Sequence, residues 1–252
     1  MLSQILPAEI FAFMLVFTRV GAIIMLVPAI GERTIPARVR LSLALMLALL
    51  ISQVVRGSLP ELPGAPLALF MILGGEIVIG LFIGTAARFI MTGLHVAGSV
   101  IAFQAGLSVA QAFNPTEGVQ SAVMANFFNT TGVVILFAAN LHMMFIAAMR
   151  DSYILFPPAS LPPVSDFAEL VTGMLANSFN LGIHIAAPFL VYGLLFYMSV
   201  GILGRLMPQV QVFFVAMPLQ ILLAFSILMF ILSSTFLWFV NYFGDAMSAF
   251  IL

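Results

Sequence analysis

The side chains that most often carry enzymatic chemistry are scarce in this chain and match no catalytic motif. Cysteine is absent, which excludes thiolate catalysis, disulfides and cysteine-based metal sites. His95, His142 and His184 lie far apart, and none belongs to an HExxH pattern for zinc. Neither a G-x-S-x-G motif nor a phosphate-binding glycine loop occurs. We therefore expect no enzymatic activity, no metal site and no cofactor.

Three charged residues, Arg19, Glu76 and Arg88, lie in or at the edges of apolar runs. A charge at the middle of a membrane span costs about 2.5–3.5 kcal/mol on insertion scales, so such residues usually pair or face water. They could line an ion or proton pathway, but a single carboxylate with no second acid nearby makes a poor cation site. We favour pairing between helices, with Arg88 reaching an interface as a further possibility.

The stretch Gly98–Ser121, GSVIAFQAGLSVAQAFNPTEGVQS, is polar and rich in glycine between apolar runs. Backbone that is not helical occurs at membrane depth only where it is buried in protein or lines a watery cavity. The stretch is therefore a pore loop, a plug or a substrate site, or else an ordinary loop outside the membrane. Gly106 and Gly118 would give its backbone freedom, and Phe103 and Phe113 would give it bulk.

The composition is that of a polytopic membrane protein. Hydrophobic residues make up 63% of the 252 residues and charged residues 7%, against about 45–50% and about 25% in soluble domains. This length accommodates several spans of about 20 residues each and leaves no room for a separate soluble domain. A net charge of −1 without a basic patch argues against nucleic-acid binding. The N-terminus has no basic region before its first apolar run, so we expect that run to remain as a span.

An all-α fold with about six hydrophobic helices follows from the apolar runs. Gly80-x-x-x-Gly84 and Ala44-x-x-x-Ala48 would let helix backbones approach each other closely. The last two runs would form a helical hairpin around the turn Arg205–Gln209. The six runs are Ile10–Ile30, Leu41–Val55, Leu67–Ala87, Val123–Met149, Leu170–Gly204 and Val210–Phe243.

Arginine placement predicts how these runs cross the membrane, because short cytoplasmic loops carry an excess of basic residues. Arg33, Arg38 and Arg40 place the first loop in the cytoplasm. Arg205 joins them on that side if Gly98–Ser121 dips into the membrane and returns. This central re-entrant segment would leave six crossings with both termini outside.

Two motifs resemble the FliR/SctT family of type III secretion export-gate proteins. RLMPQVQVFFVAMPLQI, Arg205–Ile221, is similar to the family signature R-x-x-PQ-x-x-V-F-x-x-x-x-P, with matches at Arg205, Pro208, Gln209, Val212, Phe213 and Pro218. Gly98–Ser121 is similar to the family's G-x-x-I-x-F-Q-x-G stretch with a following P-x-x-G turn. The chain departs from the family at Asn140-Leu141-His142, where the pattern has Asn-Gly-His. The resemblance covers essentially the full length.

The resemblance implies a component of the flagellar type III export gate in the bacterial inner membrane, within the flagellar basal body. Unfolded proteins would be its substrates, and P-type and Q-type gate subunits its partners, together with FlhB-type and FlhA-type export proteins. Residues 1–170 would resemble a P subunit and residues 171–252 a Q-subunit hairpin. A plug in the segment 98–121 would involve Phe103, Gln104, Gly106, Ser108, Gln111, Phe113, Asn114, Pro115, Glu117, Gly118 and Gln120.

Two other functions stay open at this point. A virulence-type secretion gate would share the same motifs. A small secondary transporter could use the broken segment as its site, although transporters usually contain internal repeats with paired broken helices, and only one broken segment is visible. An intramembrane enzyme lacks candidate residues.

Overall fold

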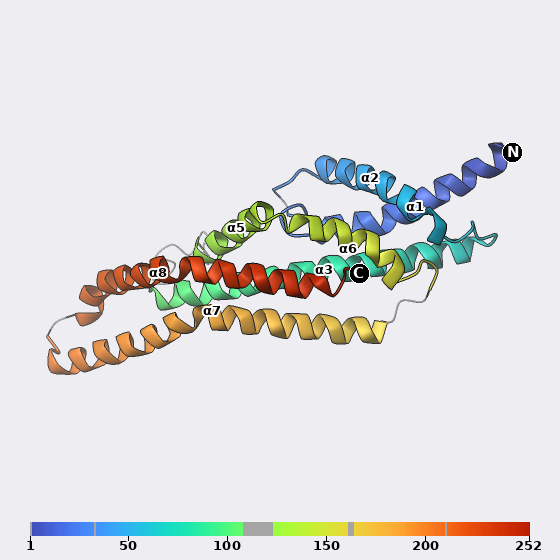
Figure 1. Ribbon diagram of the computed structural model, residues 1–252. Coiled ribbons are helices and arrows are strands. Elements are labelled where there is room, and N and C mark those ends of the chain that lie inside the picture. The colour runs from blue at the N-terminus through green and yellow to red at the C-terminus, as the bar shows by residue number, and fades with distance from the viewer. Residues whose placement is uncertain (1, 33, 108–122, 161–163, 210) are drawn as a thin grey trace. The chain divides into compact units, whose positions relative to one another are not determined.

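Every regular element in the described part of the chain is a helix, which confirms the predicted all-α fold (Figure 1). The computed structural model describes residues 2–32, 34–107, 123–160, 164–209 and 211–252. A short 3-10 helix, Arg56–Ser58, follows the second α-helix. The α-helices are α1 (Leu2–Leu26), α2 (Ala37–Val54), α3 (Pro66–Gln104), α5 (Val123–Ala138), α6 (His142–Leu155), α7 (Val164–Leu206) and α8 (Val212–Ser248).

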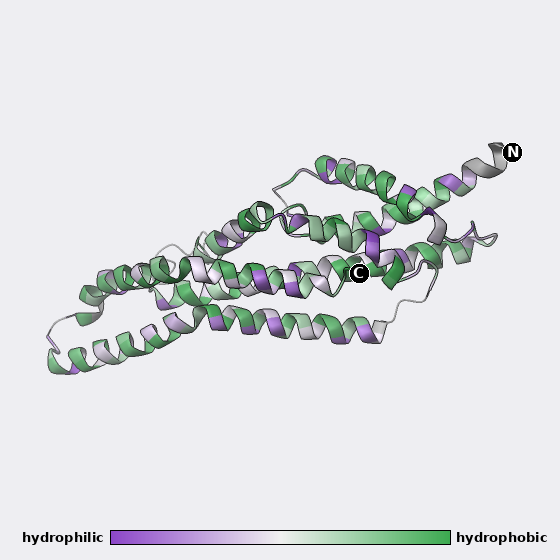
Figure 2. Cartoon of the chain, viewed as in Figure 1, coloured by the Kyte–Doolittle hydropathy of each residue, from purple (hydrophilic) through white to green (hydrophobic). Residues whose placement is uncertain are grey.

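Five of the described helices are long and apolar enough to cross a membrane. A sixth span results if α5 and α6 are counted as one broken span. Hydrophobic residues follow these helices along most of their length (Figure 2). The protein is therefore a polytopic helical membrane protein, while the side of the membrane on which each loop lies stays a prediction.

Helix α3 is longer than the third apolar run predicted. It begins at Pro66, a residue suited to the first helical position, and runs past Ala87 to Gln104. Gly98 lies inside this helix and does not interrupt it. Its lack of a side chain allows α5 to pass closely, since a Cβ at Gly98 would be 2.5 Å from the Cα of Ala125. The predicted break at Gly98 is therefore wrong. Most of the predicted plug, residues 108–121, lies outside the described residues.

The predicted run Val123–Met149 is also two helices rather than one, because Asn140 ends α5. Asn140 has a φ of 58°, a left-handed conformation that asparagine tolerates better than most residues. Its N–H donates to the Phe137 carbonyl and that of Leu141 to the Leu136 carbonyl, at 3.1 and 2.9 Å. This pair of bonds is the Schellman arrangement that terminates helices, and α6 starts at His142.

The chain divides into two compact units that are not consecutive in sequence. The first contains Met1–Ile90, Leu136–Leu175 and Phe243–Leu252, and the second contains Met91–Ile135 and Ala176–Tyr242. Helices α3, α7 and α8 contribute residues to both. The division at residue 170 implied by the resemblance stays a prediction.

In the first unit, α1 and α3 pack at the predicted small-residue positions. A Cβ at Gly80 would lie 2.6 Å from the Arg19 carbonyl oxygen, and one at Gly84 would lie 2.7 Å from the Cβ of Leu26. The predicted close approach at Gly80-x-x-x-Gly84 is confirmed. Aromatic packing adds to this core, since the Phe82 ring stacks on Phe167 with centroids 3.8 Å apart and also contacts Phe156 and Phe250.

In the second unit, glycines again mark the closest helix contacts. A Cβ at Gly93 of α3 would lie 2.7 Å from the Ser178 carbonyl oxygen of α7, and one at Gly182 would lie 2.6 Å from the Gly93 carbonyl. Phe128 of α5 stacks on Phe236 of α8, with centroids 5.7 Å apart. Small residues at such contacts are typical of helices packing in a bilayer.

A Gly80→Ala variant tests the α1–α3 contact. The added methyl group would meet the backbone carbonyl of Arg19, and such overpacking costs about 1–3 kcal/mol. We expect the variant to lose its monodisperse gel-filtration peak at a lower temperature than the parent. Gly74→Ala on the same helix is the matched control, because nothing lies within 4 Å of its Cβ position. Equal heat resistance of both variants would contradict this packing.

Candidate functional site

A buried ion pair joins α1 to α3 in the first unit. Arg19 is fully buried and Glu76 is 1% exposed. The Nε of Arg19 donates to one Glu76 carboxylate oxygen at 2.5 Å, and an Nη donates to the other at 3.0 Å. Two parallel charge-assisted bonds of this kind are the strongest arrangement for an arginine and a carboxylate. The predicted pairing between helices is confirmed for these two residues.

Helix α6 supplies the remaining partners of the Arg19 guanidinium. The Nη1 of Arg19 donates to the Ser152 carbonyl at 2.8 Å and to the Ser152 hydroxyl at 3.3 Å. Its Nη2 also donates to the Phe156 carbonyl at 2.9 Å. The last carbonyls of a helix have no partner within the helix, and Arg19 supplies a donor to that of Phe156, while the Ser152 carbonyl also accepts the Phe156 N–H at 2.9 Å.

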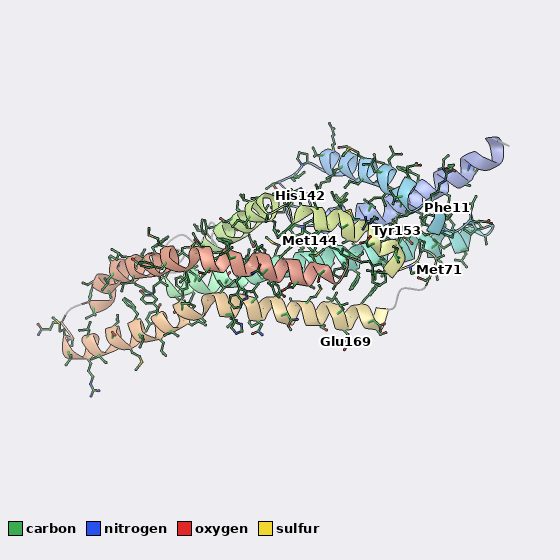
Figure 3. The ribbon with its side chains drawn as sticks, viewed as in Figure 1. Phe11, Met71, His142, Met144, Tyr153 and Glu169 are labelled. Carbon is green, nitrogen blue, oxygen red and sulfur yellow. The ribbon has the colours of Figure 1, made fainter. Side chains whose placement is uncertain are left out.

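Tyr153 of α6 (Figure 3) covers the guanidinium, whose Cζ lies 4.1 Å from the centroid of its ring. A cation over an aromatic face is attracted to it. The five N–H groups of the guanidinium thus face five oxygen acceptors and one aromatic ring. This closed set of partners fastens three helices together and offers no donor to a passing ion.

The predicted plug enters the described structure only at its beginning, in the second unit. Phe103 is 60% exposed, whereas the backbone carbonyl of Gln104 accepts a hydrogen bond from the Gln220 amide of α8 at 2.8 Å. Gly106 has a φ of 75°, a conformation that favours glycine. The other predicted plug residues lie outside the described part: Ser108, Gln111, Phe113, Asn114, Pro115, Glu117, Gly118 and Gln120.

The signature residues lie around the connection between α7 and α8. Arg205 is in the last turn of α7, and the connection contains Pro208 and Gln209. Phe213 is in the first turn of α8, and Pro218 is inside that helix. Arg205, Pro208, Gln209 and Pro218 are exposed. Among the described residues, no hydrogen bond or ion pair joins these matched positions to the end of α3. Gln220 of the same Arg205–Ile221 stretch does donate to the Gln104 carbonyl, so the two motifs meet at that bond.

The histidines each have a local contact. His95 is 3.3 Å from the Asn129 amide, the ring of His142 stacks on Phe137, and His184 is 2.8 Å from the Asn180 carbonyl. Within the described ranges, no group of three or more histidine or acidic side chains is close enough to hold a metal ion.

Sequence reasoning missed the partners that complete both polar centres. Ser152 and Tyr153 were not linked to Arg19, and Gln220 was not linked to Gln104. Gln220 did carry a signal: it is the only amide side chain in the long apolar part of α8 that follows Pro218 and precedes Asn241. A polar residue in such a helix usually has a partner on another helix.

Paired substitutions separate a structural role of Arg19 and Glu76 from an ion pathway. Arg19→Met leaves the Glu76 carboxylate buried without its partner, which costs about 3–5 kcal/mol. We expect this variant to denature at a lower temperature or to fail to accumulate. The double variant Arg19→Met/Glu76→Met should recover much of the loss, because no charge is then buried.

The exposed pair Arg56–Glu9 is the matched control. Arg56→Met should change stability by about 0–1 kcal/mol, as is usual for surface ion pairs. A double variant at Arg19 and Glu76 that is as unstable as Arg19→Met alone would contradict a role in pairing. A stable double variant that has lost the biological function of the chain would indicate an ion pathway instead.

Comparison with known proteins identifies the family. Residues 10–246 match the family described as "Bacterial export proteins, family 1". The chain is 41% identical over 220 residues to the "Flagellar biosynthetic protein FliR" of Caulobacter vibrioides, covering 87% of this chain and 88% of that one. It is 29% identical to the protein of the same name in Bacillus subtilis, over 92% and 90% of the two chains. The "Yop proteins translocation protein T" of Yersinia pestis is 24% identical, over 87% and 85%. The match along nearly the whole sequence confirms the FliR/SctT resemblance, and the chain belongs to family 1 of the bacterial export proteins.

Proposed function

We propose that this chain is a non-enzymatic subunit of the flagellar type III export gate, through which unfolded flagellar proteins cross the bacterial inner membrane. The observation that carries the proposal is the 41% identity to a flagellar biosynthetic protein over 87% of this chain and 88% of that one, within a family match from residue 10 to 246. The flagellar proteins of Caulobacter vibrioides and Bacillus subtilis, at 41% and 29% identity, are more similar to the chain than the Yop translocation protein, at 24%. This ranking favours a flagellar gate over a virulence-type gate.

Helix length supports a role within an assembly. Helices α3, α7 and α8 contain 39, 43 and 37 residues, which correspond to about 55–65 Å at 1.5 Å per residue. The hydrocarbon core of a bilayer is only about 30 Å thick. Apolar helices of this length would leave hydrophobic surface in water if the chain were alone, so neighbouring subunits would have to cover it.

Exposed apolar side chains are numerous on the helical hairpin. Met229 and Phe230 of α8 are 83% and 86% exposed, and Leu206 at the end of α7 is 71% exposed. The exposed signature residues lie near that end as well. Residues that define a family signature without packing inside the chain are suited to contacts with partners, and P-type and Q-type gate subunits are the partners we propose.

The same proposal assigns the remaining parts of the chain. Residues 1–170 would act as the P-like part and 171–252 as the Q-like hairpin, with the plug in the segment 98–121. FlhB-type and FlhA-type export proteins would be further neighbours. A secondary transporter is the second candidate, but it would need a complete polar site within one chain. The N–H donors of Arg19 and of the Gln220 amide are instead used by partners within the chain.

Co-expression tests whether the chain is a gate subunit. We expect it to purify as a stable complex only when P-type and Q-type subunits are produced with it, because those subunits cover its apolar helices. The measurement is the mass of the detergent-solubilised particle, with the chain expressed alone as the control. A well-behaved isolated monomer that transports a small solute would contradict the proposal and favour the transporter.

A further inference from the structure

At the end of α3, the backbone carbonyl of Gln104 receives its hydrogen bond from another helix. The Gly106 N–H donates to the Phe103 carbonyl and the Leu107 N–H to the Ala102 carbonyl, both at 3.1 Å. Together with the positive φ of Gly106, this is a Schellman ending. It satisfies the carbonyls of Ala102 and Phe103 but leaves that of Gln104, which therefore needs a donor from outside α3.

Gln220 of α8 is that donor, and it is buried, with 3% of its surface exposed. Its amide nitrogen lies 2.8 Å from the Gln104 carbonyl and 3.0 Å from the Tyr197 hydroxyl of α7. A glutamine amide has two N–H donors, and both are used. One side chain thus connects α3, α7 and α8 within the second unit.

Gly106 leaves the space in which the Gln220 amide lies, whereas Tyr192 bonds to the backbone of Gln220. The Tyr192 hydroxyl of α7 donates to the backbone carbonyl of Gln220 at 2.8 Å. A Cβ at Gly106 would lie 3.0 Å from the amide carbon and oxygen of Gln220, so a larger residue there would push the amide from its present position by a few tenths of an ångström. Gly193 of α7 likewise accommodates the Gln104 side chain, which reaches the position where a Cβ would be.

We infer that Gln220 is a positioning residue of the export gate, whose hydrogen bonds to Gln104 and Tyr197 set where the chain leaves α3. The inference rests on the proposed gate function and names a residue that positions the end of α3 within it. The end of α3 is where the described chain meets the predicted plug, whose remaining residues lie outside the described part.

A hydrogen bond is suited to positioning the end of α3, because it is directional and because another polar group or water can replace either partner. An unpaired buried carbonyl or amide is costly, so the end of α3 leaves Gln220 only when water or another polar group replaces the lost bonds. Apolar packing alone would allow the end of α3 to slide along the hairpin. The arrangement therefore gives the end of α3 one defined docked position.

Gln220→Met tests this role, because methionine is similar in length but has no N–H donor. Losing a hydrogen bond should increase the undocked population about fivefold, the equivalent of about 1 kcal/mol. We expect the complex with P-type and Q-type subunits to assemble normally. A Leu107→Cys reporter in that complex should react with a maleimide about fivefold faster, and the resting ion conductance of the reconstituted complex should rise. The chain has no cysteine of its own, so its labelling is read from the mass of this subunit.

Two tyrosine variants provide a matched comparison. Tyr197→Phe removes a partner of the Gln220 amide and should raise labelling and conductance in the same direction but less. Tyr192→Phe removes a bond to the backbone of Gln220 and should leave both at the parent's level. If Gln220→Met does not assemble, the comparison of Tyr197→Phe with Tyr192→Phe tests the inference: faster labelling and higher conductance of Tyr197→Phe would support it.

The inference would be overturned if Tyr197→Phe, and Gln220→Met where it assembles, had the same labelling rate and the same conductance as Tyr192→Phe. The gate function would stand in that case, because assembly with the partners is observed independently. A parent chain that does not assemble with those partners would contradict the gate function itself.

Discussion

An arginine can lie inside an apolar helix only if every one of its donors meets an acceptor supplied by the protein. Arg19 meets this condition through Glu76 on α3 and through Ser152 and Phe156 at the end of α6. These partners lie 57 to 137 residues away in sequence, so the positions of α1, α3 and α6 in the first unit depend on one another. The glycines at 80 and 84 make the arrangement possible by bringing α3 close to α1.

The second unit obeys the same rule with neutral groups. The Gln104 carbonyl is left over by the ending of α3 and is satisfied by Gln220 on α8, which in turn contacts Tyr197 on α7. Apolar contacts in a bilayer discriminate poorly between neighbouring positions along a helix, because lipid is as apolar as the side chains. Polar contacts discriminate well, and each unit contains one that connects three helices. The first is ionic and closed, whereas the second lies where the chain enters the predicted plug.

Much of this organisation could be predicted from the sequence because composition and periodicity report directly on the membrane. The helical class, the pairing of buried charges between helices, the close packing at Gly80 and the family were predicted and are confirmed, the pairing for Arg19 and Glu76. The extent of α3 was not, since Gly98 was interpreted as a break although it serves a close contact with Ala125. The end of α5 was missed for a similar reason: Asn140 takes a left-handed conformation that its residue type allows but does not require. Gln220 acquires its role only from helices brought together by folding, which no local pattern reveals.

We propose that this chain helps form a channel for unfolded proteins and that part of the segment 98–121 closes it at rest. A pore wide enough for an unfolded chain would pass ions unless something that can move aside fills it. The most direct measurement is the resting ion conductance of the reconstituted complex with and without residues Gln111–Gly118. We expect the shortened complex to assemble and to conduct ions at rest, whereas the parent complex stays closed. An assembled complex that lacks these residues and is as ion-tight as the parent would contradict it and would place the seal in the partner subunits.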